Sequence, residues 1–380
     1  VKSLRLLSCP KRMASAVADG EVDAQDWMTW FLGTSEEELI KNKDRYFDGE
    51  NFRGAEGKMW PAGVFECPAV AELQREIETM PSLRSPEHSC PLKVIDGIDI
   101  GNYQANFSTE QKAMVQIASN FHCLENGRPS TAADCGRLVT GYALDSTQGP
   151  AASFGVPAAS LLRAHYAFKA AGKEPKYWGQ TSERQINLIG DICHPLDNYC
   201  GDCQNGKARL RGTEAPVTPE LLDVVAGKVK VGLHRDAQVV FRRGRDRRKL
   251  AVVEQPQLVD QLCCATLCYG FANAEHDPPR EQLESLTRAL LRAAYEGAYL
   301  AAIKRERKVL LLTLIGGASF RNPHDIILEE IKRAHTKYAS HPASQLQEVQ
   351  LVLYESRAAA RYQQALDSDS AKTQSRCTVN

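Results

Sequence analysis

The sequence contains no long hydrophobic run and no excess of charge of either sign. No stretch approaches the roughly 18 to 20 apolar residues that a membrane-spanning helix needs, and the first residues lack the apolar core of a signal peptide. Lys plus Arg and Asp plus Glu both total 47 among the 380 residues, so no net field draws the protein towards nucleic acid or an anionic membrane. We therefore expect a soluble, cytoplasmic or otherwise intracellular protein with no nucleic acid or membrane partner.

Both common nucleotide-binding fingerprints are also missing, although one glycine-rich turn stands out. An apolar stretch, Lys308–Ile315, runs into Gly316-Gly317 and then into a helical pattern from His324. No Lys-Ser or Lys-Thr follows the glycines, as it would in a P-loop, and their spacing is not that of a dinucleotide-binding turn. Backbone N–H groups at such a strand-to-helix junction suit phosphate oxygens. The alternative is a plain connection between a strand and a helix.

The cysteines are numerous but do not form a disulfide pattern. The twelve of them are scattered through a long chain, which favours buried, reduced thiols. Cys193, His194, Cys200 and Cys203 could together complete a tetrahedral zinc site. Only one Cys-x-x-Cys pair is present, however, and an adjacent Cys and His rarely bind one ion, so we predict no metal site.

Strand and helix patterns alternate through most of the chain. The predicted elements are a strand at 114–119, a helix at 156–171, a hairpin of 228–241 with 250–253, a buried segment at 259–269, a helix at 280–305, a strand at 309–315, a helix at 324–338 and a strand at 349–354. This alternation predicts an α/β fold with a largely parallel sheet that helices cover on both faces. In the helix at 280–305, Glu296 lies off the apolar stripe and is expected to face solvent.

The domain organisation follows from composition. Residues 1–100 mix helical signals with Gly and Pro breaks and are predicted to form a helical N-terminal extension or lid packed on the core. Residues 101–360 are predicted to form the α/β domain, with a polar insertion near 190–213. Residues 361–380, rich in Ser, Asp and Thr, are predicted to be a flexible tail.

A second loop of small residues, Asp145–Gly155, lies between the strand that ends at Ser119 and the helix that starts at Val156. Its small side chains let a ligand approach the backbone, and the helix that follows offers a positive end to phosphate. In an open α/β sheet, ligands bind beyond the carboxyl ends of the strands. The two loops should therefore flank one crevice and hold a diphosphate from both sides.

The order of these segments resembles that of the macrodomain family. In that family a strand ends in an Asn, a glycine-rich loop leads into a helix, and a later strand feeds a Gly-x-aromatic-x-x-Pro loop. The matching segments here are Val115–Asn120, Gly149–Phe154, and Gly317–Phe320 with Pro323. The runs Asn120–Glu125 and Thr147–Ser153 are more similar to a divergent, MavL-like branch of the family. The likeness covers roughly residues 100 to 355 in element order.

The resemblance implies a three-layer α/β/α fold with the mixed sheet of macrodomains, and an ADP-ribosyl hydrolase that removes ADP-ribose from modified protein side chains. The MavL-like branch points to arginine-linked ADP-ribose, with ubiquitin as a candidate target protein. ADP-ribose is then the ligand or product, and no cofactor is needed.

Two alternatives remain open. One is a non-catalytic ADP-ribose reader, because Gly149-Pro150-Ala151-Ala152 replaces the family's three glycines and Pro lacks an N–H donor. The other is a scaffold with a vestigial pocket. No Glu-Glu pair occurs in this loop, which disfavours the poly(ADP-ribose) glycohydrolase subclass.

Hydrolysis at the anomeric carbon of a ribose passes through an oxocarbenium-like centre, so a carboxylate is expected near it. Asp145 is the first candidate because it directly precedes the loop; capping the loop as an Asx-turn is the alternative role. Glu275 and Asp277 follow the buried segment and are further candidates, with solvated loop acids as the alternative.

The predicted ligand contacts come from the two loops and the strand end. They are Asn120, Phe121, Thr147, Gln148, Gly149, Ala151, Ala152, Ser153, Phe154, Gly316, Gly317, Ala318, Ser319 and Phe320. By the resemblance, Asn120 and Gln148 position the distal ribose. Phe154 and Phe320 are placed to stack on ribose or adenine, or else to pack in the core.

Overall fold

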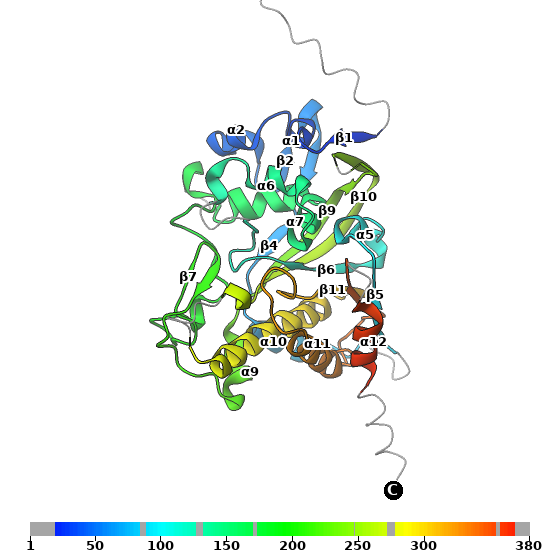
Figure 1. Ribbon diagram of the computed structural model, residues 1–380. Helices are drawn as coiled ribbons and strands as arrows, with labels where there is room; N and C mark the ends of the chain where they lie inside the picture. Colours follow the sequence, from blue (N-terminus) through cyan, green and yellow to red (C-terminus); the bar gives the residue numbers. More distant parts are fainter. Residues whose placement is uncertain are drawn as a thin grey trace, which may run out of the picture.

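A twisted, mostly parallel sheet forms the centre of the molecule (Figure 1). The computed structural model describes residues 20–83, 89–126, 132–169, 173–246, 248–271, 278–354 and 358–368. Within these ranges the sheet has eight strands. In spatial order they are β4 (Val64–Glu66), β9 (Gly232–Arg243), β10 (Lys249–Cys264), β6 (Ala113–Ala118), β11 (Val309–Leu312), β12 (Glu348–Val352) and β5 (Leu92–Ile95), with β1 (Glu21–Asp23) paired to β10.

Five neighbouring strands run in the same direction. β10, β6, β11, β12 and β5 pair in parallel, whereas β9 pairs antiparallel with both β10 and β4. Strands buried on both faces read as continuous apolar runs, and Val309–Leu312 of β11 is buried at every position. The carboxyl ends of the five parallel strands therefore meet at one edge of the sheet.

Helices cover both faces of the sheet (Figure 1). One layer contains α4 (Val70–Glu78), α9 (Leu222–Lys228), α10 (Arg280–Lys304) and α11 (His324–Tyr338). The other contains α5 (Ile100–Gln104), α6 (Leu138–Gly141), α7 (Gln148–Phe154) and α8 (Pro157–Leu161), which continues into a π-helical turn, Leu162–Tyr166. The C-terminal α12 (Ala359–Asp367) lies beside β5 and α11. The predicted three-layer α/β/α fold with a mixed sheet is confirmed.

Helix α10 corrects one expectation. Glu296 is 4% exposed instead of facing solvent. Its Oε2 accepts hydrogen bonds from the Tyr338 hydroxyl and from Lys337 Nζ, both at 2.9 Å, and Arg333 Nε lies 3.3 Å from Oε1. Helices α4, α9 and α11 cover α10 on several sides. The apolar stripe in its sequence therefore does not separate a buried face from a solvent-facing one.

The first hundred residues carry helices, as predicted, and also strands that the pattern did not show. The helices are α1 (Trp27–Leu32), α2 (Glu36–Lys41), α3 (Lys43–Tyr46) and α4, and a hairpin joins β2 (Asn51–Arg53) to β3 (Met59–Pro61). β1, β4 and β5 from the same segment belong to the main sheet. The N-terminal segment is thus part of the sheet as well as a cover over it. Its division from the α/β domain near residue 100 stays a prediction.

An aromatic cluster holds this cover in place. Trp27, Phe31 and Phe52 are at most 1% exposed, and their rings contact Phe241 of β9 or Tyr166. Burying apolar area of this kind contributes roughly 25 cal/mol per Å². The polar insertion near 190–213 contains a short hairpin of β7 (Asp202–Gln204) and β8 (Lys207–Arg209). Within the described part of the chain, none of the helices combines the length and apolar character needed to span a membrane.

Candidate active site

A cavity of about 510 Å³ opens where the carboxyl ends of the five parallel strands meet. Its walls come from the segments that follow β5, β6, β10, β11 and β12 and from the start of α7. The volume lies in the range of small-molecule sites, roughly 300 to 1,000 Å³. Ala151 of the first loop and Gly317 of the second both line it, so the predicted convergence of the two loops on one crevice is confirmed.

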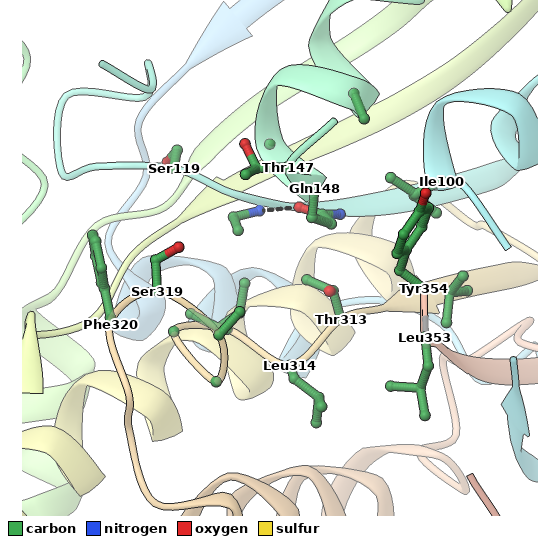
Figure 2. Close-up of a pocket in the computed structure, with 18 of the residues that line it drawn as sticks. Ile100, Ser119, Thr147, Gln148, Thr313, Leu314, Ser319, Phe320, Leu353 and Tyr354 are labelled. Atoms are coloured by element: carbon green, nitrogen blue, oxygen red, sulfur yellow. Dashed lines mark hydrogen bonds between the residues drawn. The ribbon is translucent and has the colours of Figure 1, made fainter. Parts of the chain in front are cut away.

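The cavity is lined by part of the predicted set. The predicted ligand-binding residues that line it are Thr147, Gln148, Gly149, Ala151, Gly316, Gly317, Ala318, Ser319 and Phe320. Figure 2 shows Thr147 and Gln148 on one wall and Ser319 and Phe320 on the loop opposite. Ile100, Leu353 and Tyr354 lie at the other end of the cavity in the same view. Contact of any of these residues with a ligand stays a prediction.

Gln148 is fixed to the edge of strand β6. Its Oε1 accepts a hydrogen bond from the backbone N–H of Ala118 at 2.7 Å, drawn in Figure 2, and its Nε2 donates to the carbonyl of Gln116 at 2.9 Å. These bonds lie beyond Val115, the last residue of β6 that pairs with β11. The side chain therefore completes the strand ladder where its neighbour ends. This geometry argues against the expected direct role of Gln148 in holding a ribose.

Gly149 occupies a position that admits no side chain. A Cβ there would lie 2.0 Å from the carbonyl oxygen of Ala118 and 2.2 Å from Oε2 of Glu125. Real Cβ atoms do not approach other heavy atoms so closely. The glycine lets the start of α7 lie directly against the end of β6, and this contact forms the floor of one end of the cavity.

The second loop is held in shape by its own residues. Gly316 has φ +70°, in the left-handed region, and a Cβ there would lie 2.3 Å from Thr266 Cγ2. Asn322 Nδ2 donates to the carbonyls of Gly316 at 3.1 Å and Leu267 at 3.0 Å. His324 Nε2 lies 2.8 Å from the carbonyl oxygen of Gly317. These hydrogen bonds fix the shape of the loop. Ala318 and Ser319 lie exposed at the rim of the cavity.

Several predicted contacts lie outside the cavity, and helical geometry explains most of them. They are Asn120, Phe121, Ala152, Ser153 and Phe154, all buried. Successive residues of α7 point in directions about 100° apart, so only some can face the crevice. Asn120 donates from Nδ2 to Asn126 Oδ1 at 2.8 Å, so it is not placed to hold a distal ribose.

The buried faces of α7 have structural partners of their own. Ser153 Oγ accepts a hydrogen bond from Arg163 at 3.3 Å. Phe154 is buried in the same hydrophobic core cluster as Trp27 and Phe31, and the Arg243 guanidinium lies 4.8 Å from its ring centre. Of its two predicted roles, Phe154 takes core packing, whereas Phe320 lines the cavity.

The three predicted catalytic acids are not brought together in the crevice. The Asp145 carboxylate accepts from the Thr147 N–H at 2.9 Å and from Thr147 Oγ1 at 2.7 Å. This is the loop-capping geometry that was its alternative role, and Asp145 is not among the residues that line the cavity. Glu275 and Asp277 lie outside the described residues.

A different acid lines the cavity, and sequence reasoning missed it. Glu125 borders the cavity beside Ser119 and Gly149. Its Oε2 is buried and has no hydrogen-bond partner among the described residues. Burial raises the pKa of this carboxyl to about 7, the nearby Asp145 carboxylate acts in the same direction, and Lys207 opposes them. Its position in the loop after β6, at the carboxyl edge of the sheet, was the signal that could have revealed it.

The cysteine and histidine group of the insertion does not show a metal-binding arrangement. No cluster of three or more His, Cys, Asp or Glu side chains able to hold an ion occurs among the described residues. A hydrogen bond with Cys193 and burial raise the pKa of the Cys200 thiol, and burial raises the pKa of Cys203 to about 12.

The chain matches known proteins in its three-dimensional structure and not in its sequence. No protein-family model matches the sequence, and no curated protein matches it. Among solved structures, the chain is similar to poly(ADP-ribose) glycohydrolase from Thermomonospora curvata, with 12% identity, a TM-score of 0.45, and 88% of this chain and 98% of that chain covered. It is also similar to poly(ADP-ribose) glycohydrolase from Deinococcus radiodurans in complex with ADP-ribose, with 12% identity, a TM-score of 0.45, and 81% and 95% covered.

Proposed function

We propose that this protein is an ADP-ribosyl hydrolase, which binds an ADP-ribosyl group in the crevice and cleaves its bond to a protein side chain. The observation that carries the proposal is the shared cavity of two glycine-containing loops, Gln148–Ala151 and Gly316–Phe320, at the carboxyl edge of the sheet. Ligands of open α/β folds bind at this edge, and close backbone approach from two sides suits a diphosphate.

The residues that line the crevice are mainly apolar at one end and include polar side chains at the other. This change suits the successive parts of ADP-ribose. One end is mainly apolar and is lined by Ile98, Ile100, Val352, Leu353, Tyr354, Ala358 and Tyr362. An adenine ring would bury its faces there, while the two loops in the middle face the diphosphate. The far end, with Ser119 and Glu125, would then receive the distal ribose and the bond to be cleaved.

The linkage and target are finer parts of the proposal. The likeness of Asn120–Glu125 and Thr147–Ser153 to the MavL-like branch of macrodomains supports arginine-linked ADP-ribose, with ubiquitin as the first target to test. Cleavage of that N-glycosidic bond needs positioning of the ribose and a carboxyl group that moves a proton.

A reader module is the second candidate, and two observations favour it. Pro150 removes an N–H donor from the first loop, and Asp145 is engaged with Thr147 instead of facing the cavity. A reader would bind ADP-ribose in the same crevice and leave the bond intact.

Two measurements separate these functions. Calorimetry with ADP-ribose tests binding, and release of free ADP-ribose from arginine-modified ubiquitin and from a second arginine-modified protein tests hydrolysis. The hydrolase proposal expects both binding and release. Binding without release from either substrate would leave the reader, and absence of binding would reject both functions and leave the scaffold.

A further inference from the structure

We infer that Glu125 is the catalytic acid of the crevice, the group that protonates the leaving side chain when the glycosidic bond breaks. The inference rests on the proposed hydrolase function and adds to it the residue that performs the proton transfer. It replaces Asp145, whose carboxylate is engaged in capping its own loop.

The position of Glu125 is the first support. Its side chain lines the cavity at the floor formed by Ala118 and Gly149. The backbone is held in place because the Glu125 N–H donates to the Tyr142 hydroxyl at 2.9 Å. Oε2 is buried and without a hydrogen-bond partner in the described structure. A buried carboxyl oxygen without a partner carries a desolvation cost, which a ligand hydrogen bond would relieve.

Comparison with the other acid of the cavity is the second support. Asp99 and Glu125 are the acids among the described residues that line the cavity. Asp99 Oδ1 accepts from the N–H of Asn102 at 3.2 Å, and its Oδ2 lies 3.3 Å from Arg243 Nε. Both carboxylate oxygens of Asp99 are thus engaged with protein groups. It also lies with Ile98 and Ile100 at the apolar end, away from the proposed ribose.

The charges around Glu125 suit an acid that holds its proton near neutral pH. Asp145, before α7, acts to raise its pKa, whereas Lys207, on β8 of the inserted hairpin, acts to lower it. The charge of Glu125 in turn acts on the thiol of Cys268, which follows β10. Burial dominates, and the pKa rises to about 7. A general acid works best with a pKa near the working pH.

The proton-transfer step follows from this arrangement. Protonated Glu125 gives its proton to the side-chain atom that leaves the anomeric carbon, and the electron pair of the breaking bond goes with that atom. A water oxygen forms the new bond to the anomeric carbon, and a proton of that water passes to the Glu125 carboxylate and restores the acid. One water is consumed, and the products are free ADP-ribose and the unmodified side chain.

The main test is Glu125→Gln, with Glu110→Gln as the matched control. Gln keeps the shape of the side chain and removes the transferable proton, and Glu110 is an exposed acid near the amino end of β6, away from the crevice. We expect Glu125→Gln to bind ADP-ribose within about threefold of wild type and to release it at least roughly 100-fold more slowly. Wild-type turnover should fall as pH rises through about 7, and the residual turnover of the variant should lose that limb.

A second variant separates a catalytic role from a structural one. Glu125→Ala should be slow, and added formate, tested at about pH 5 where part of it is protonated formic acid, should restore part of its rate by supplying a small carboxylic acid. If Glu125→Gln turns over like wild type, the inference is overturned while the hydrolase function stands. If wild type itself releases nothing, the hydrolase function is overturned and the inference falls with it. If Glu125→Gln fails to bind ADP-ribose, formate rescue of Glu125→Ala decides: rescue supports the inference, and its absence overturns it.

Discussion

Glu125 and Gly149 lie in contact at the floor of the crevice, although they come from different segments of the chain. A Cβ on Gly149 would lie only 2.2 Å from Oε2 of Glu125. The missing side chain at 149 therefore makes the space in which the carboxyl lies. The same glycine brings α7 against β6, so one residue sets both the course of the backbone and the location of the acid.

Gly149→Ala should destabilise the protein. The new Cβ would meet the backbone carbonyl of Ala118, which cannot turn aside as a flexible side chain could. Overpacking of this kind costs typically about 1 to 3 kcal/mol, and urea unfolding measures it. Gly227→Ala in α9 is the control, because its Cβ would meet Ala71 Cβ at 3.4 Å and Ala favours a helix by roughly 0.5 to 1 kcal/mol. Equal stability of the two variants would contradict the steric account.

The stability of Glu125→Gln relative to wild type should depend on pH. The folded-state pKa of Glu125 is raised from 4.5 to about 7, so its favourable contribution is complete below about pH 4.5 and is lost as pH rises through 7. The amide of Gln cannot ionise. Moving from pH 4 to pH 8 should therefore shift the free energy of unfolding in favour of the variant by on the order of 3 kcal/mol, at about 1.4 kcal/mol per pKa unit.

Urea unfolding at several pH values measures this difference, with Glu110→Gln as the surface control. A difference between Glu125→Gln and wild type that stays constant from pH 4 to pH 8 would show that Glu125 is not desolvated as the structure indicates. This measurement needs no ligand, so it tests the environment of the carboxyl independently of the proposed reaction.

A charge placed at the rim of the crevice should impair ADP-ribose binding. Ala318 is exposed and lines the cavity on the second loop. Ala318→Glu would bring a carboxylate towards the diphosphate and should weaken binding at least about tenfold, or 1.4 kcal/mol. Ala318→Gln adds almost the same volume without charge and should bind more tightly than the Glu variant. Calorimetry gives both affinities, and equal weakening would mean that the loop does not face phosphate.

The buried hydrogen bonds of Glu36 beneath the N-terminal cover should contribute much to the stability of the cover. Glu36 and His165 are each 1% exposed, and Glu36 Oε1 lies 2.9 Å from His165 Nε2. Glu36 also accepts hydrogen bonds from the backbone N–H groups of Val139 and Thr140. Glu36→Ala leaves these buried groups without their acceptor and should cost about 1 to 3 kcal/mol for each group left unpaired.

Glu37→Ala on the same helix is the control, because Glu37 pairs with Lys41 at the surface, where ion pairs contribute little to stability. Burial acts to raise the pKa of Glu36, but the interactions with His165 and Thr140 outweigh it and lower the pKa. The contribution of Glu36 is thus present above pH 4.5 and lost as pH falls through its folded-state pKa. Thermal unfolding of the two variants, compared at neutral and acidic pH, checks both statements.

The sequence predicted the elements of the α/β core closely where the hydrophobic pattern was long and clear. The helix expected at 324–338 is α11, the one expected at 280–305 is α10, and the hairpin is formed by β9 and β10. In the first hundred residues, β1, β4 and β5 are only three or four residues long. Strands this short carry too little alternation to be recognised, and their partners lie far away in the chain.

The sequence predicted where the two loops of the candidate site lie, but it predicted the roles of their side chains less well. The two loops converge as expected because the carboxyl ends of parallel strands share one edge. Asp145 was chosen for its place next to the loop, yet its oxygens cap that loop. Gln148 was expected to face the ligand, yet it completes the β6 ladder. Local bonds of this kind compete for polar side chains, and spacing along the chain does not show which bond is formed.

The sequence by itself determined the order of strands and helices and the edge of the sheet where a ligand would bind, because periodicity and chain direction are local properties. The tertiary structure alone decided which acid lines the cavity and which is capped. It also decided that Glu296 is buried, because burial and hydrogen-bond partners come from segments that are distant in the chain. Glu125 is a candidate only through the fold, which buries it and brings Gly149 of α7 against its carboxyl group, since a carboxyl group acquires an unusual pKa from its surroundings.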